Sequence, residues 1–140
     1  MHCPFTGINI PRFIIATLAG FIFVFGLDYI VHQNLLTDLY DITSSFWRAP
    51  ESMQSIFPLV ILRTLLLVTV TAYIFTRNFE GKGIKEGIRF GMPFGLLFAL
   101  FMGSSYLWMP IPLELALSWA ISGLATGFGL GIIFSLTYRK

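Results

Sequence analysis

The sequence predicts an all-α, polytopic membrane protein, with residues 1–140 forming a single four-helix transmembrane bundle. Hydrophobic residues make up 56% of the chain and charged residues 11%, with a mean hydropathy of +0.79. A typical soluble domain contains about 25% charged residues. Four apolar stretches approach the roughly 20 residues that a helix needs to cross a bilayer. The connections between these stretches differ in their content of basic residues.

The first span is expected at residues 13–36, with Pro11 in the first helical turn. Proline is tolerated there because its missing N–H would have no helical acceptor. The apolar run exceeds the roughly 7–15 residues of a signal-peptide core, and no A-x-A-like site follows it. We therefore expect an uncleaved first helix.

The other spans are expected at residues 56–76, 88–108 and 113–138. The first connection is the longest, and its Phe46 and Trp47 are expected at the headgroup surface, which aromatic rings prefer. The third connection is short and contains Pro110 and Pro112. Such a connection predicts that the third and fourth spans form a tight hairpin.

Basic residues gather in the middle connection and at the C-terminus, in the set Arg77, Lys82, Lys85, Arg89, Arg139 and Lys140. The first connection offers only Arg48, and the third has no basic residue. Because loops rich in lysine and arginine stay in the cytoplasm, both termini and the middle connection are predicted to be cytoplasmic. This is an N-in/C-in topology.

Three ionisable residues interrupt the first two spans: Asp28, His32 and Arg63. A charged side chain within a bilayer costs at least about 2.5 kcal/mol, so such residues are rare without a partner or a function. Asp28 and His32 are four residues apart and are expected on one helical face. Asp28 and Arg63 lie roughly 12 and 10 Å from the outer ends of their spans, at about 1.5 Å per residue. Antiparallel neighbours would therefore bring them together.

Two interpretations of this set remain open. A bidentate pair between Asp28 and Arg63 would offset part of the desolvation cost and fix how the first two helices pack. Alternatively, the residues form a functional site in which His32 titrates or binds a ligand. His32 is expected to donate a hydrogen bond to Asp28 or to a backbone carbonyl, unless its side chain reaches the membrane interface.

A polar stripe follows the fourth span, where four residues recur at four-residue spacing: Glu114, Ser118, Ser122 and Thr126. One interpretation is an acid at the helix start followed by hydroxyls bonded to carbonyls one turn earlier. In the other, Glu114 and Ser118 join the charged residues of the first two spans in an outward-facing polar pocket.

Glycines repeat at the same spacing in the last two spans, in the set Gly87, Gly91, Gly95, Gly123, Gly127 and Gly131. Small residues at this spacing let helix backbones approach closely. The repeats predict either packing of these spans within one chain or a surface for another subunit. Gly129 adds a second notch to the fourth span, which favours an additional partner.

The composition also bears on cofactors and partners. Asp28, His32 and Glu114 offer ligands for a divalent ion, but a facing Arg63 would repel a cation, so no metal and no cofactor are expected. A net charge of +2 without a basic run argues against a nucleic-acid partner. The single cysteine, Cys3, excludes an intrachain disulfide. The lipid bilayer is the expected partner.

Two parts of the chain, DYIVHQNLLTDLY followed by FWRAPESM, and GIKEGIRFGMPFG, carry a resemblance. They resemble small four-span inner-membrane proteins of bacteria, in families whose function is not defined. The resemblance implies a four-helix fold and a location in the bacterial inner membrane. It implies no activity.

The leading functional hypothesis is a non-enzymatic accessory or scaffold component of a membrane assembly, either a homo-oligomer or part of a larger complex. Short loops and glycine-notched helices favour it. The alternative is transport or small-ligand binding through the outward-facing pocket. A third hypothesis is a membrane enzyme in which His32 acts as general base and Asp28 orients it.

Overall fold

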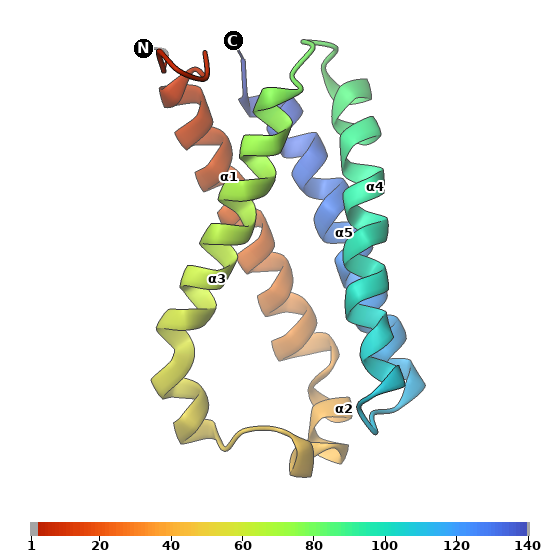
Figure 1. Cartoon of the computed structure of the whole chain (residues 1–140). Helices are drawn as coiled ribbons and strands as arrows, with labels where there is room; N and C mark the ends of the chain where they lie inside the picture. Colours follow the sequence, from red (N-terminus) through yellow and green to blue (C-terminus); the bar gives the residue numbers. More distant parts are fainter. Residues whose placement is uncertain (1–2, 140) are drawn as a thin grey trace.

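Helices account for most of the computed structural model, which describes residues 3–139 (Figure 1). The elements are, in order, α1 (Ile10–Ile30), a π-helical segment (Val31–Leu35), α2 (Thr37–Ile42), α3 (Pro50–Arg77), α4 (Ile84–Gly103) and α5 (Leu113–Thr137). Short 3-10 turns cover Ser44–Phe46 and Ser104–Leu107. The described residues contain no β-strand, and the predicted all-α class is confirmed.

Four helical stretches are long and apolar enough to cross a membrane: Ile10–Leu35, Pro50–Arg77, Ile84–Leu107 and Leu113–Thr137. Their number agrees with the sequence prediction. The second begins at Pro50 rather than at residue 56, because proline fits the first position of a helix and Glu51 complements the positive helix start. Pro11 occupies the first turn of α1 as predicted.

The chain has two distinct ends (Figure 1). The terminal end holds both termini and the α3–α4 connection, and the far end holds α2 and the α4–α5 connection. At the terminal end Arg77 donates a hydrogen bond to the Thr6 carbonyl at 3.0 Å, and the Asn9 amide donates to the hydroxyl of buried Tyr138 at 3.3 Å. Lys140, which the sequence placed with the basic C-terminus, lies outside the described residues.

α5 is the central helix of the fold, because it packs against α4 along most of its length and also contacts α1 and α3. α1 and α3 cross each other (Figure 1). The three helices meet at Gly20 of α1, where an added Cβ would lie 2.8 Å from Val68 Cγ1 and 2.9 Å from Phe134 Cε1. Because real Cβ atoms essentially never come within 3.0 Å of a neighbour, this crossing requires glycine.

α4 and α5 approach each other through the glycines that the sequence singled out. A Cβ at Gly87 would lie 2.5 Å from the carbonyl oxygen of Gly131, and a Cβ at Gly91 would lie 2.8 Å from that of Gly127. Backbone atoms likewise face the remaining members of the set, Gly95 and Gly123. The glycine repeats therefore serve packing within one chain.

The second notch of α5, at Gly129, is also filled from within the chain. The ring of Phe23 from α1 occupies the space where a Cβ of Gly129 would stand. This notch therefore does not argue for an additional partner, in contrast to the expectation from the sequence.

The larger of two hydrophobic clusters lies toward the terminal end and includes Val24, Val68, Phe75, Leu130 and Phe134. A smaller cluster at the far end includes Leu36, Ile111 and Leu115. In α3 the buried residues begin at Thr64, and none of residues 50–63 is buried. Beyond its crossing with α1, this part of α3 diverges from the other helices toward the far end (Figure 1). We call residues 50–63 the free half of α3.

The glycine contacts generate a stability prediction. Gly127→Ala should lower the free energy of unfolding by about 1–3 kcal/mol, because its methyl group would collide with the backbone of Gly95. Gly26→Ala is the matched control, since nothing lies within 4 Å of a Cβ there. This control should be neutral or stabilising by about 0.5–1 kcal/mol. Thermal unfolding in detergent compares the two, and equal melting temperatures would contradict the α4–α5 contact.

Candidate ligand cavity

A cavity of about 820 Å³ lies between the free half of α3 and the facing parts of α1 and α2. Small-molecule sites usually measure about 300–1,000 Å³. Its apolar wall includes Phe25 of α1 and Ile56, Phe57 and Val60 of α3. Its polar and aromatic wall includes Asp28, His32, Gln33, Thr37, Tyr40, Asp41, Trp47, Arg48, Arg63 and Trp119.

The three ionisable residues of the predicted spans all line this cavity. Asp28 Oδ2 and Arg63 Nη1 lie 3.8 Å apart, as the similar depth of the two residues predicts. The expected bidentate hydrogen-bonded pair is not formed within residues 3–139, because α3 has already diverged from α1 at this level. The Arg63 side chain is 60% exposed and that of Asp28 is 28% exposed.

The contact between Asp28 and Arg63 is not a hydrogen bond. Its N···O separation of 3.8 Å exceeds the usual range of donor–acceptor distances. A guanidinium group has five N–H donors, and in the described part of the chain those of Arg63 make no hydrogen bond. The pair therefore leaves donors directed at the cavity for another group to use.

His32 lies in the π-helical segment and is bonded to α2 rather than to Asp28. Its Nδ1 lies 2.5 Å from the hydroxyl of Tyr40, which also accepts a hydrogen bond from Trp119 Nε1 at 2.8 Å. An indole N–H only donates, so the Tyr40 hydroxyl is the acceptor toward Trp119. Toward His32 Nδ1 it donates or accepts according to the imidazole tautomer. The expected bond from His32 to Asp28 or to a backbone carbonyl is not found among residues 3–139, where the ring pairs through Nδ1 with the Tyr40 hydroxyl.

An aromatic cluster of Tyr40, Trp47 and Trp119 forms part of the cavity wall. Tyr40 and Trp47 meet edge to face at 5.5 Å between ring centroids, and Trp47 and Trp119 lie 6.0 Å apart. Trp47 also donates from Nε1 to Thr43 Oγ1 at 2.8 Å. Burial raises the pKa of Tyr40, so its hydroxyl stays protonated at neutral pH and keeps its bridging role.

The fourth-span stripe does not join this site. Among the described residues, neither Glu114 nor Ser118 lines the cavity, and α5 contributes Trp119 instead. Ser118 Oγ donates to the Glu114 carbonyl at 2.8 Å, and Thr126 Oγ1 donates to that of Ser122 at 2.9 Å. These two hydroxyls follow the back-bonding interpretation, whereas Ser122 Oγ makes no hydrogen bond among the described residues. The alternative in which Glu114 and Ser118 line the pocket is not supported.

Sequence reasoning missed the aromatic cluster. The expectation for Trp47 concerned the headgroup surface and did not include the packing of its ring against Tyr40 and Trp119. Trp119 follows Ser118 directly and, in the sequence, resembles the other large apolar residues of its span. The one available signal was its indole N–H, which needs an acceptor when buried.

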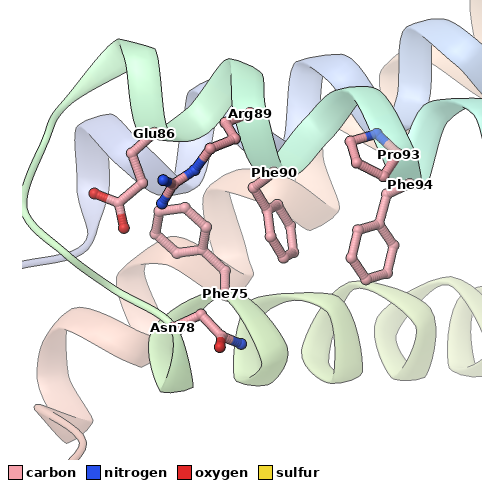
Figure 2. A pocket seen from close by; sticks show the side chains of 7 residues that line it. All are labelled: Phe75, Asn78, Glu86, Arg89, Phe90, Pro93 and Phe94. Carbon is pink, nitrogen blue, oxygen red and sulfur yellow. The ribbon is translucent and has the colours of Figure 1, made fainter.

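A smaller cavity of about 230 Å³ lies between α3 and α4 at the terminal end (Figure 2). Figure 2 shows Phe90 and Phe94 projecting from α4 toward α3. Buried Glu86 accepts hydrogen bonds from the backbone amides of Glu80 at 2.6 Å and Lys82 at 2.8 Å. Because this carboxylate is already bonded to the α3–α4 connection, we assign the region a structural role.

Glu80 completes this network at the surface. Its carboxylate pairs with Lys82 and accepts a hydrogen bond from Arg89 at 2.6 Å. Hydrogen bonds from Lys82 and Arg89 lower the pKa of Glu80. The ion pairs of Glu80 therefore tie the α3–α4 connection to the first turns of α4.

Within the described part of the chain, no three side chains of His, Cys, Asp or Glu come together as metal ligands.

Comparison with protein-family models, curated proteins and solved structures gives no match. The functional argument therefore depends on the large cavity and the residues around it.

The hydrogen bonds of Tyr40 generate a second prediction. Tyr40→Phe should lower the free energy of unfolding by about 1–3 kcal/mol, because it leaves the partly buried Trp119 N–H and His32 Nδ1 without their partner. Tyr106→Phe is the matched control on an exposed ring and should stay within about 0.5 kcal/mol. Thermal unfolding in detergent measures both, and equal effects would show that the Tyr40 hydroxyl is not a bridge.

Proposed function

We propose that the chain is a multi-pass protein of a bacterial cytoplasmic membrane and binds a small ligand in the large cavity. Four helices of sufficient length and hydropathy support membrane insertion. The resemblance to small bacterial inner-membrane proteins supports the choice of membrane. Transport of the bound ligand is one use of such a site.

The proposed orientation places both termini and the α3–α4 connection in the cytoplasm. The connection and the first turns of α4 carry Lys82, Lys85 and Arg89, and cytoplasmic loops favour such residues. Both termini lie at the same end as this connection (Figure 1). The cavity, at the far end, then lies in the outer half of the membrane.

One observation carries the proposal of ligand binding: a single large cavity collects every ionisable residue that interrupts the first two spans. A pair that only fixes helix packing should be in close, bonded contact, because desolvation otherwise exceeds the Coulombic gain. Asp28 and Arg63 instead stand 3.8 Å apart beside an open volume. Intramembrane charged residues around a cavity typically mark a ligand pathway.

The other two hypotheses have less support. The glycine repeats that favoured an accessory or scaffold role are used in packing between α4 and α5. For an enzyme with His32 as base, Asp28 should orient the imidazole through a hydrogen bond. Tyr40 takes His32 Nδ1 instead.

The orientation is testable by cysteine labelling in a Cys3→Ser background. A membrane-impermeant maleimide added to intact cells should modify Ser44→Cys, in the first connection, and should miss Lys82→Cys until the cells are permeabilised. The physical reason is the excess of basic residues in the middle connection. The opposite labelling pattern would reverse the topology and place the cavity in the inner half of the membrane.

The cavity is testable by filling it. Val60→Trp, in the cavity wall, should abolish ligand retention without lowering the melting temperature, because the new ring occupies open volume. Leu62→Trp is the matched control on an exposed part of α3 outside the set of lining residues. Native mass spectrometry of protein extracted from cell membranes would detect a bound mass in the wild type and the control. Its persistence in Val60→Trp would contradict binding at this cavity.

A further inference from the structure

We propose that the ligand is a zwitterionic phospholipid whose headgroup carries a phosphate and a primary ammonium. This inference rests on the proposed function, since it names the occupant of the same cavity. It is drawn from the balance of charges in the cavity wall, from the apolar surface beside them, and from the position of the free half of α3.

The charged groups of the wall match a headgroup with both signs. Arg48 and Arg63 line the cavity, and within residues 3–139 neither donates a side-chain hydrogen bond. Arginine is suited to phosphate because its planar fork donates two parallel hydrogen bonds. Asp28 and Asp41 line the same cavity and are acceptors for an ammonium group. The two guanidinium groups and two carboxylates are together electrically neutral.

This balance decides between classes of ligand. A simple anion would pair with the guanidinium groups but would also face two carboxylates. A simple cation would pair with the carboxylates but would also face two guanidinium groups. A phosphate joined to an ammonium presents one group to each kind of side chain and leaves no net charge in a medium where charge is expensive.

The apolar wall indicates a lipid rather than a free headgroup compound. Phe25 and Phe57 meet edge to face at 6.2 Å between ring centroids and join α1 to α3. Ile56, Phe57 and Val60 continue this wall along the free half of α3. A free headgroup compound would leave these apolar side chains uncovered, whereas the acyl chains of a lipid would cover them.

Trp47 and Trp119 in the cavity wall provide the readout. The third tryptophan, Trp108, is 71% exposed and is not a lining residue, so Trp108→Phe removes the background signal. This protein is reconstituted into nanodiscs of phosphatidylcholine. Small mole fractions of acyl-brominated phosphatidylethanolamine, phosphatidylglycerol or phosphatidylcholine are then added as quenchers of tryptophan fluorescence.

Phosphatidylethanolamine should quench at about tenfold lower mole fraction than either other lipid. Combining Arg48→Gln with Arg63→Gln should abolish this preference by removing the charge-assisted bonds to phosphate. Arg12→Gln, at the terminal end, is the matched control and should leave the quenching curve unchanged. If the double variant does not fold, Asp41→Asn on exposed α2 replaces it and should reduce the preference for the ammonium headgroup.

Each of the other possible outcomes would overturn a specific part of the inference or of the proposed function. Equal quenching by the three lipids would mean non-specific bilayer contact and would overturn the inference. Preference for phosphatidylglycerol or phosphatidylcholine would overturn the primary ammonium. If only soluble O-phosphoethanolamine shifted the tryptophan emission, the lipid source would be wrong and the proposed function would stand. No response to any probe, with no bound mass in the native protein, would overturn both.

Discussion

The close crossing of α1, α3 and α5 at Gly20 is the constraint on which the cavity depends. The absence of a side chain there brings Val68 and Phe134 against the α1 backbone and forms the core toward the terminal end. Straight helices that touch at one point separate on either side of it. The free half of α3 therefore diverges from α1. The charged residues beyond this crossing form the wall of a cavity instead of a packed interface.

The sequence predicts the parts of the fold that depend on local composition. The number of spans follows from the hydropathy of the chain, and the position of Pro11 follows from the preference of proline for a first helical turn. The similar depth of Asp28 and Arg63 follows from the rise per residue of a helix. The glycine spacing indicates close helix contact, but it does not distinguish the same chain from another subunit. That choice depends on which backbone lies opposite, and here α5 lies opposite α4.

The parts of the site that escaped prediction depend on contacts between distant segments. The partner of His32 is on α2, and the indole that completes the network comes from Trp119, 79 residues after Tyr40. One interpretation of the four-residue stripe placed Glu114 and Ser118 in the pocket, but helix rotation decides which face of α5 is used. Trp119, the neighbour of Ser118, takes that place. Periodicity defines a face, whereas tertiary packing decides what the face meets.

The lack of buried residues in the free half of α3 has a dynamic consequence. Segments with few buried contacts open at the lowest free energies, independently of global unfolding. A sideways swing of this half about Thr64, the first buried residue, would leave the core contacts of the terminal end in place. The α3 side of the cavity is therefore bounded by a segment whose displacement leaves the packed core unchanged.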